Sequence, residues 1–201
     1  MRARDIMTKS VLSVQPSVPV GKAAATLAKR GFTALPVVNE SGELIGIVTE
    51  ADLIGNRFPV TGQPVGTSAA DRPATTVGEV MSSPVVGISH DTDVSVVARE
   101  MLTGKRRSLP IVDGTALVGI ITRRDIIRAL ARTDEEIAAD VRGKLAVIGG
   151  VSRWSVRVGN GEVVLGDRYR ESSDRPIARA LVESVPGVIS VTIVAPIIAT
   201  A

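Results

Sequence analysis

The chain has 201 residues, of which 44% are hydrophobic and 22% are charged. A chain this apolar can bury enough surface to offset its ordering entropy, which excludes wholesale disorder. It contains no cysteine and a single histidine, which excludes disulfides, thiol chemistry and most zinc sites. Aromatic residues make up only 2%, and the net charge of +3 is spread along the chain, so the composition argues against a nucleic-acid partner.

The N-terminal residues 1–10 are polar and lack the apolar stretch of a signal peptide. No run of about 18 apolar residues is present to span a membrane. We therefore expect a cytoplasmic protein.

An internal repeat occupies the first two thirds of the chain. The matching segments are Met7–Val11 with Met81–Val85, Leu35–Val38 with Leu109–Val112, and Gly46–Thr49 with Gly119–Thr122. The offset between the copies shortens by one residue at the turn before the last pair. This spacing predicts two copies of one supersecondary unit.

Each copy is predicted to form a strand, a helix, two strands and a second helix. The expected strands and first helices are 11–14, 20–30, 35–38 and 44–48 in the first copy, and 85–88, 94–103, 109–112 and 117–121 in the second. Gly31 and Gly104 stand where C-terminal helix caps belong. Such a small unit leaves one apolar sheet face exposed, so the two copies are expected to pack as a pair.

The domain boundaries follow from composition. Repeat 1 is assigned to residues 1–56 and repeat 2 to residues 75–131. Residues 57–74, rich in Gly, Pro, Ser, Thr and Ala, are predicted to be a linker, with a functional lid as the alternative.

The pattern changes in residues 132–201. Three acidic residues, Asp134 to Glu136, favour a helix start. Asn160-Gly161 is a hairpin signal between two strands. A helix at 175–185 and a strand at 188–194 complete a helix–strand–strand–helix–strand order. The overall fold class is therefore α/β for the repeats and α+β for this small C-terminal domain.

The doubled pattern Leu-Pro-h-Val, then Gly-h-h-Thr-x-x-Asp (h, apolar), resembles the CBS domain family. The two copies together resemble the tandem CBS, or Bateman, module. The C-terminal segment resembles the BON domain, through its acidic-capped helix, the hairpin with Val158, Gly161, Val163 and Leu165, and Val185-Pro186-Gly187-Val188.

Thr49-x-x-Asp52 and Thr122-x-x-Asp125 each stand at a step from a strand into a helix. Free backbone N–H groups there attract anions, and a carboxylate can accept hydrogen bonds from two ribose hydroxyls. The alternative is a capping box, in which the Thr and the Asp close their own helix end.

The resemblance implies two clefts between the repeats. Their candidate ligand-binding residues are Asp125, Thr122, Ile120 and Arg107 with Ser10, Phe32 and Thr33 in one cleft, and Asp52 and Thr49 with Pro84 and Arg106 in the other. The first cleft is the preferred one. The basic run at 105–107 suits phosphate, with solvated surface charges as the alternative.

The resemblance implies a non-catalytic regulatory protein that senses an adenosine-containing ligand: AMP, ADP, ATP or S-adenosylmethionine. It requires no metal and no resident cofactor. The alternatives are a ligand-free interaction scaffold and a peripheral phospholipid-binding protein acting through the BON-like domain. The resemblance also implies a homodimer through the repeats, with a protein or lipid partner for the BON-like domain.

Overall fold

The computed structural model describes residues 1–57, 74–150, 152–169 and 173–194. The chain forms two compact units: Met7–Thr92 with Arg99–Thr122, and Met1–Ile6 with Asp93–Ala98 and Arg123–Ala201. Residues 58–73 of the predicted linker or lid lie outside the described residues.

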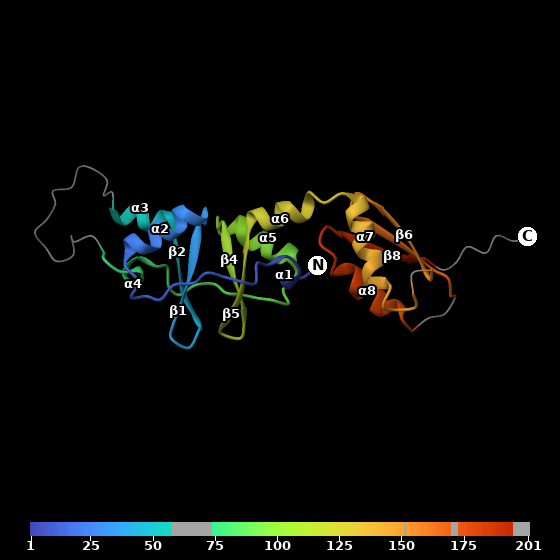
Figure 1. Cartoon of the computed structure of the whole chain (residues 1–201), viewed down its shortest axis with the longest axis horizontal. Coiled ribbons are helices and arrows are strands. Elements are labelled where there is room, and N and C mark those ends of the chain that lie inside the picture. Colours follow the sequence, from blue (N-terminus) through green and yellow to red (C-terminus); the bar gives the residue numbers. More distant parts are fainter. Residues whose placement is uncertain (58–73, 151, 170–172, 195–201) are drawn as a thin grey trace, which may run out of the picture. The chain divides into compact units, whose positions relative to one another are not determined.

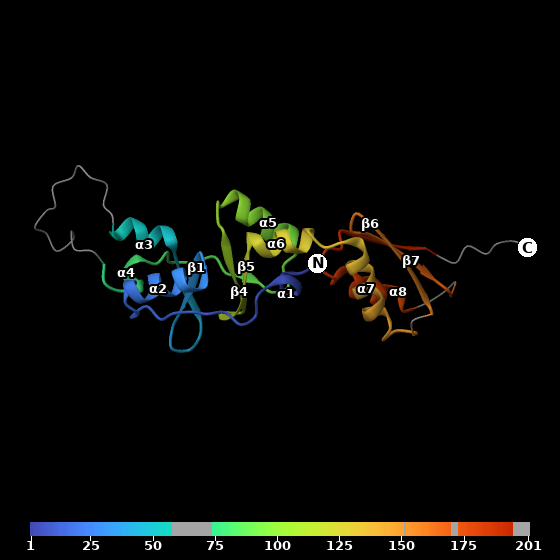
Figure 2. The same ribbon diagram turned by 45° about the horizontal axis from the view of Figure 1, so that its top comes forward.

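The first repeat is built around a two-stranded hairpin. Its elements are α2 (Val20–Arg30), β1 (Ala34–Val38), β2 (Leu44–Thr49) and α3 (Glu50–Arg57), and α4 (Val77–Val80) follows in the chain. The strands pair antiparallel, with Ala34 opposite Thr49. Figure 2 shows α2, α3 and α4 beside the hairpin, and their apolar side chains share one buried cluster with it.

The second repeat has the sheet order β3–β4–β5, with β3 parallel to β4. Its elements are β3 (Ile88–Ser89), α5 (Val94–Thr103), β4 (Ser108–Asp113), β5 (Ala116–Thr122) and α6 (Arg123–Leu130), and α1 (Ala3–Ile6) lies at the N-terminus. The mixed α/β class and the pair of similar repeats agree with the sequence prediction.

Three local predictions were wrong. Residues 11–14 do not form a strand, because only Val14 makes a backbone bridge, to Val37. Of the expected strand 85–88 only Ile88 is in a strand, since β3 pairs with β4 through Ile88 and Ser89 alone. Gly104 does not supply the left-handed residue after α5. Its N–H continues the helical pattern to the carbonyl of Glu100, and the positive φ falls one residue later, at Lys105. Gly31, by contrast, caps α2 with φ 65°.

The C-terminal domain has the predicted helix–strand–strand–helix–strand order. Its elements are α7 (Asp134–Leu145), β6 (Trp154–Gly159), β7 (Glu162–Asp167), α8 (Arg175–Glu183) and β8 (Ser190–Val194). β7 lies between antiparallel β6 and parallel β8. α7 and α8 lie side by side against the sheet (Figure 1), and their apolar side chains share one buried cluster with its strands.

Two polar arrangements define this domain. Thr133 and Glu136 form a reciprocal capping box at the start of α7, and the Asp134 carboxylate accepts hydrogen bonds from the Asn160 and Gly161 N–H groups at 2.8 and 2.9 Å. The acidic first turn therefore also anchors the hairpin turn. Within the described residues, no helix has the length and apolar character that a membrane span requires.

Candidate functional site

A cavity of about 510 Å³ lies in the unit formed by Met7–Thr92 and Arg99–Thr122. Both repeats contribute to its walls. Its lining residues are Thr33, Ile47, Thr49, Glu50, Ala51 and Ile54 from the first repeat, Ser82, Pro84, Val85 and Val86 from the segment before β3, and Lys105 to Pro110 around the start of β4.

Backbone pairing between the repeats positions these walls. Ile47 in β2 exchanges two hydrogen bonds with Ser82, at 3.1 and 2.9 Å. Thr8 and Ile120 exchange the equivalent pair, at 3.0 and 3.1 Å. Each repeat therefore pairs its own first segment with the last strand of the other repeat, which brings Pro84 and Thr49 to the same cavity.

Thr49 and Asp52 form a capping box where β2 enters α3. The Asp52 Oδ2 atom accepts hydrogen bonds from the Thr49 N–H and hydroxyl, both at 2.7 Å, and the Asp52 N–H donates to Thr49 Oγ1 at 3.3 Å. Thr49 lines the cavity, whereas Asp52 is not among its lining residues. In this structure the Thr49-x-x-Asp52 motif therefore caps the start of α3, and Asp52 Oδ2 is the accepting atom.

This geometry predicts a stability effect at Asp52. Asp52→Ala removes both acceptor interactions and should lower the free energy of unfolding by about 1 kcal/mol, and Asp52→Asn, which keeps a side-chain oxygen, should cost less. Urea denaturation followed by far-UV circular dichroism measures the difference. An Asp52→Ala protein as stable as the wild type would contradict the capping role.

The basic run before β4 lies at the cavity. Arg106 folds back on the end of α5, since a Cβ at Gly104 would lie 2.7 Å from its guanidinium Nη1. Arg107 Nη1 lies 3.7 Å from the Glu50 carboxylate. Ser108, which is buried, begins β4 beneath the run. The cavity thus combines mostly apolar walls with cationic side chains on one side.

The structure brings together five of the candidate residues and leaves six elsewhere. Lining the cavity are Thr33, Thr49, Pro84, Arg106 and Arg107. Thr33 and Arg107 were assigned to the other cleft from the resemblance. The candidates outside this cavity's lining are Ser10, Phe32, Asp52, Ile120, Thr122 and Asp125.

Asp125, the central residue of the preferred cleft, lies in the first turn of α6. This helix belongs to the compact unit that contains Arg123–Ala201 and not to the unit that holds the cavity. Its side chain is buried, and Arg128 Nη1 donates to its Oδ1 at 3.4 Å. Thr122 ends β5 and is half-buried.

The sequence analysis missed several lining residues. Ile47 was detectable, because it matches Ile120 in the aligned repeats. Glu50 and Ala51 occupy the two variable positions of Thr-x-x-Asp, and their residue types gave no indication that they line a cavity. Ser82 could be identified only from the backbone pairing between the repeats, which no local sequence pattern encodes.

A family model for the CBS domain matches residues 3–58 and again residues 77–132. The chain belongs to the CBS domain family. The two matched copies form its CBS pair, and the C-terminal domain from residue 133 lies outside the match.

The curated relatives that this chain matches include enzymes with different names. An inosine-5′-monophosphate dehydrogenase of Methanocaldococcus jannaschii is 30% identical over 147 residues, which are 73% of this chain and 26% of that enzyme. This chain spans about a quarter to a third of the length of the first curated relatives that it matches. The similarity to this enzyme therefore concerns a part of it and not its whole activity.

Two solved CBS pairs carry adenosine compounds. CBSX2 in complex with AMP superposes with a TM-score of 0.57 at 29% identity, covering 64% of this chain and 94% of that one. The CBS pair of MJ0100, in complex with 5′-methylthioadenosine and S-adenosyl-L-methionine, gives a TM-score of 0.53 at 29% identity, with the same coverage. These two solved structures of similar fold are therefore complexes with adenosine-containing compounds.

Proposed function

We propose that the CBS pair of this protein binds an adenosine-containing ligand in the cavity lined by both repeats, and that the protein is regulatory and not catalytic. The cavity itself carries the proposal. Its volume of about 510 Å³ falls within the usual range of small-molecule sites. Apolar side chains such as Ile47 and Val85 suit a purine, and the basic run suits an anionic group.

Regulation follows from the way the cavity is built. Its walls come from two repeats joined by short backbone pairings, such as the one between Ile47 and Ser82. A ligand that contacts both walls stabilises the arrangement of the repeats that it binds best, by as much as its affinity for that arrangement exceeds its affinity for others. AMP, ADP, ATP and S-adenosylmethionine are the candidates.

The other sequence predictions remain proposals of the same kind. The BON-like character of the C-terminal domain has the element order in its favour. The homodimer through the repeats, and a protein or lipid partner for the C-terminal domain, rest on resemblance.

Calorimetric titration with the four ligands tests the proposal. Saturable binding of at least one ligand is expected. Ala51→Trp, at an exposed lining position of α3, should weaken that binding by more than about tenfold, because the new side chain occupies ligand space. Ala28→Trp, at an exposed position of α2 outside the cavity lining, is the matched control and should bind normally.

Two results would overturn the proposal. If none of the four ligands binds a folded sample, the ligand-free scaffold becomes the better reading. If Ala51→Trp binds as tightly as Ala28→Trp, the ligand does not use this cavity.

A further inference from the structure

One ion pair joins the two repeats at the cavity. Glu50 is the first residue of α3, and Arg107 immediately precedes β4. The Arg107 Nη1 atom lies 3.7 Å from Glu50 Oε2, and both residues line the cavity. The Glu50 side chain is 47% exposed and the Arg107 side chain is 73% exposed, so both remain accessible to an incoming ligand.

The charges on the cavity walls are unequal. Three cationic side chains, Lys105, Arg106 and Arg107, line it, and Glu50 is the single carboxylate among its lining residues. An anionic ligand group is therefore attracted to the basic run. At Arg107, however, the Glu50 carboxylate already occupies the place beside the guanidinium that such a group would take.

The aligned repeats show that this pair is particular to one side of the CBS pair. The residue equivalent to Glu50 in the second repeat is Arg123, and the residue equivalent to Arg107 in the first repeat is Thr33. These two types cannot form an ion pair with each other. The repeated fold thus supplies two equivalent pairs of positions, and only one of them carries opposite charges.

We infer that Glu50 determines the ligand specificity of this cavity: its carboxylate competes with a ligand phosphate for Arg107, so that a phosphorylated adenosine nucleotide binds by exchanging one ion pair for another. This inference rests on the proposed adenosine ligand and adds the chemical class, a phosphate ester, and the residue that opposes it. Adenosine itself, which carries no charge, is indifferent to Glu50.

The exchange is physically feasible in both directions. An exposed, single-contact ion pair at 3.7 Å contributes little net stability, so it breaks readily. A phosphate can pair with a guanidinium through two parallel hydrogen bonds, which is a stronger interaction than the one it replaces. Glu50 therefore weakens phosphate binding without preventing it, and its release from Arg107 accompanies occupancy.

Titration of AMP and adenosine into matched variants tests this inference. Glu50→Gln, which keeps the size of the side chain and removes its charge, should tighten AMP binding by about threefold and leave adenosine binding unchanged. Glu40→Gln, an exposed change of the same kind in the β1–β2 turn, should alter neither. Arg107→Gln should weaken AMP binding by about tenfold. In the double variant Glu50→Gln with Arg107→Gln, the gain from Glu50→Gln should disappear.

The outcomes separate the inference from the proposed function. If AMP and adenosine both bind but Glu50→Gln changes both affinities equally, or neither, the exchange at Arg107 is wrong and the adenosine site stands. If the gain persists in the double variant, Glu50 acts elsewhere and the inference is likewise overturned. If neither probe binds any variant while all are folded by circular dichroism, the inference fails. If ADP, ATP and S-adenosylmethionine do not bind either, the proposed function fails with it.

Discussion

Asp167→Ala is expected to destabilise the C-terminal domain far more than the substitution of an exposed residue does. Asp167 is 1% exposed. Its carboxylate accepts from Arg153 Nε and Arg175 Nε, both at 3.3 Å, and from the Tyr169 N–H at 3.1 Å. Removing it leaves the buried Arg153 without one of its two carboxylates, and breaking a buried pair in this way costs about 3 kcal/mol.

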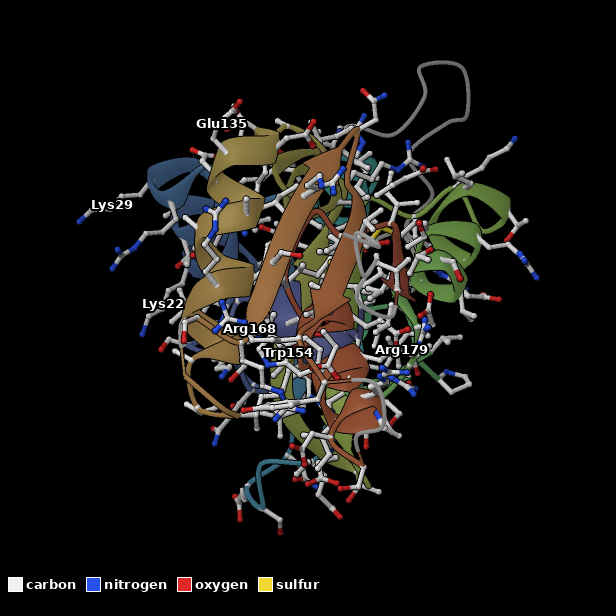
Figure 3. The ribbon with its side chains drawn as sticks, turned by 90° about the vertical axis from the view of Figure 1, so that its right-hand side faces the viewer. Lys22, Lys29, Glu135, Trp154, Arg168 and Arg179 are labelled. Atoms are coloured by element: carbon white, nitrogen blue, oxygen red, sulfur yellow. The ribbon has the colours of Figure 1, made fainter. Side chains whose placement is uncertain are left out.

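Arg153 keeps other contacts within the C-terminal domain when Asp167 is replaced. We therefore expect the loss of stability to be confined to this domain. Its guanidinium also pairs with Asp174 at 2.7 Å and lies 4.7 Å from the centre of the Trp154 ring. Trp154 and Arg168 lie close together at one end of the β6–β7 hairpin (Figure 3), where Trp154 pairs with Asp167. Because Trp154 is the single tryptophan of the chain, its fluorescence reports unfolding of this domain alone.

Denaturation followed by Trp154 fluorescence measures the effect. The matched control is Asp140→Ala, which removes a 53% exposed carboxylate paired with Arg132 and should cost less than about 1 kcal/mol. Equal unfolding midpoints for the two variants would show that the buried network contributes no more than a surface pair.

The same network predicts an acid dependence. Burial raises the pKa of Asp167, but the hydrogen bonds from Tyr169, Arg153 and Arg175 outweigh it, so the pKa lies below its ordinary value. The stabilisation is therefore complete above the unfolded-state pKa, about 3.9, and is lost as the pH falls through the lower folded-state value. Asp167→Asn should lack this part of the acid transition in Trp154 fluorescence.

Gly46→Val is expected to disrupt the CBS pair. A Cβ at Gly46 would lie 2.5 Å from the Met81 Sδ atom and 3.2 Å from the Ser82 carbonyl oxygen. Met81 and Ser82 begin the second repeat, whereas Gly46 lies in β2 of the first. Overpacking of this kind typically costs about 1–3 kcal/mol, and here it also pushes apart the pairing that forms the cavity.

A compensating change makes this prediction specific. Met81→Ala combined with Gly46→Val frees the space and should recover part of the lost stability in urea denaturation, while each single change destabilises. Gly119→Val with Met7→Ala is the equivalent test in the other repeat, because a Cβ at Gly119 would collide with the Met7 sulfur. A double variant no more stable than Gly46→Val would contradict the packing argument.

Local pattern predicted most elements of the fold. The helices 20–30 and 94–103 begin and end as predicted, because their apolar spacing and flanking residues act within a few turns. The wrong strand at 11–14 has the same origin. An apolar run can satisfy its backbone in other ways, and here only Val14 pairs.

The candidate site was only partly predictable. The Thr-x-x-Asp spacing identified Thr49, and the basic run identified Arg106 and Arg107, because residue type and spacing are local properties. The assignment of these residues to one cleft or the other could not be made from local properties. The structure places Thr33 and Arg107 at the same cavity as Thr49, and this depends on which strand pairs with which segment.

The sequence by itself determined the two repeats, most of their helices and strands, and the helix–strand–strand–helix–strand order of the C-terminal domain. Tertiary structure alone decided the contact of Met81 with Gly46, the pair of Glu50 with Arg107, and the burial of Asp167 between two arginines. Propensity and capping act between neighbours in the chain, whereas these contacts join segments whose mutual orientation follows only from packing.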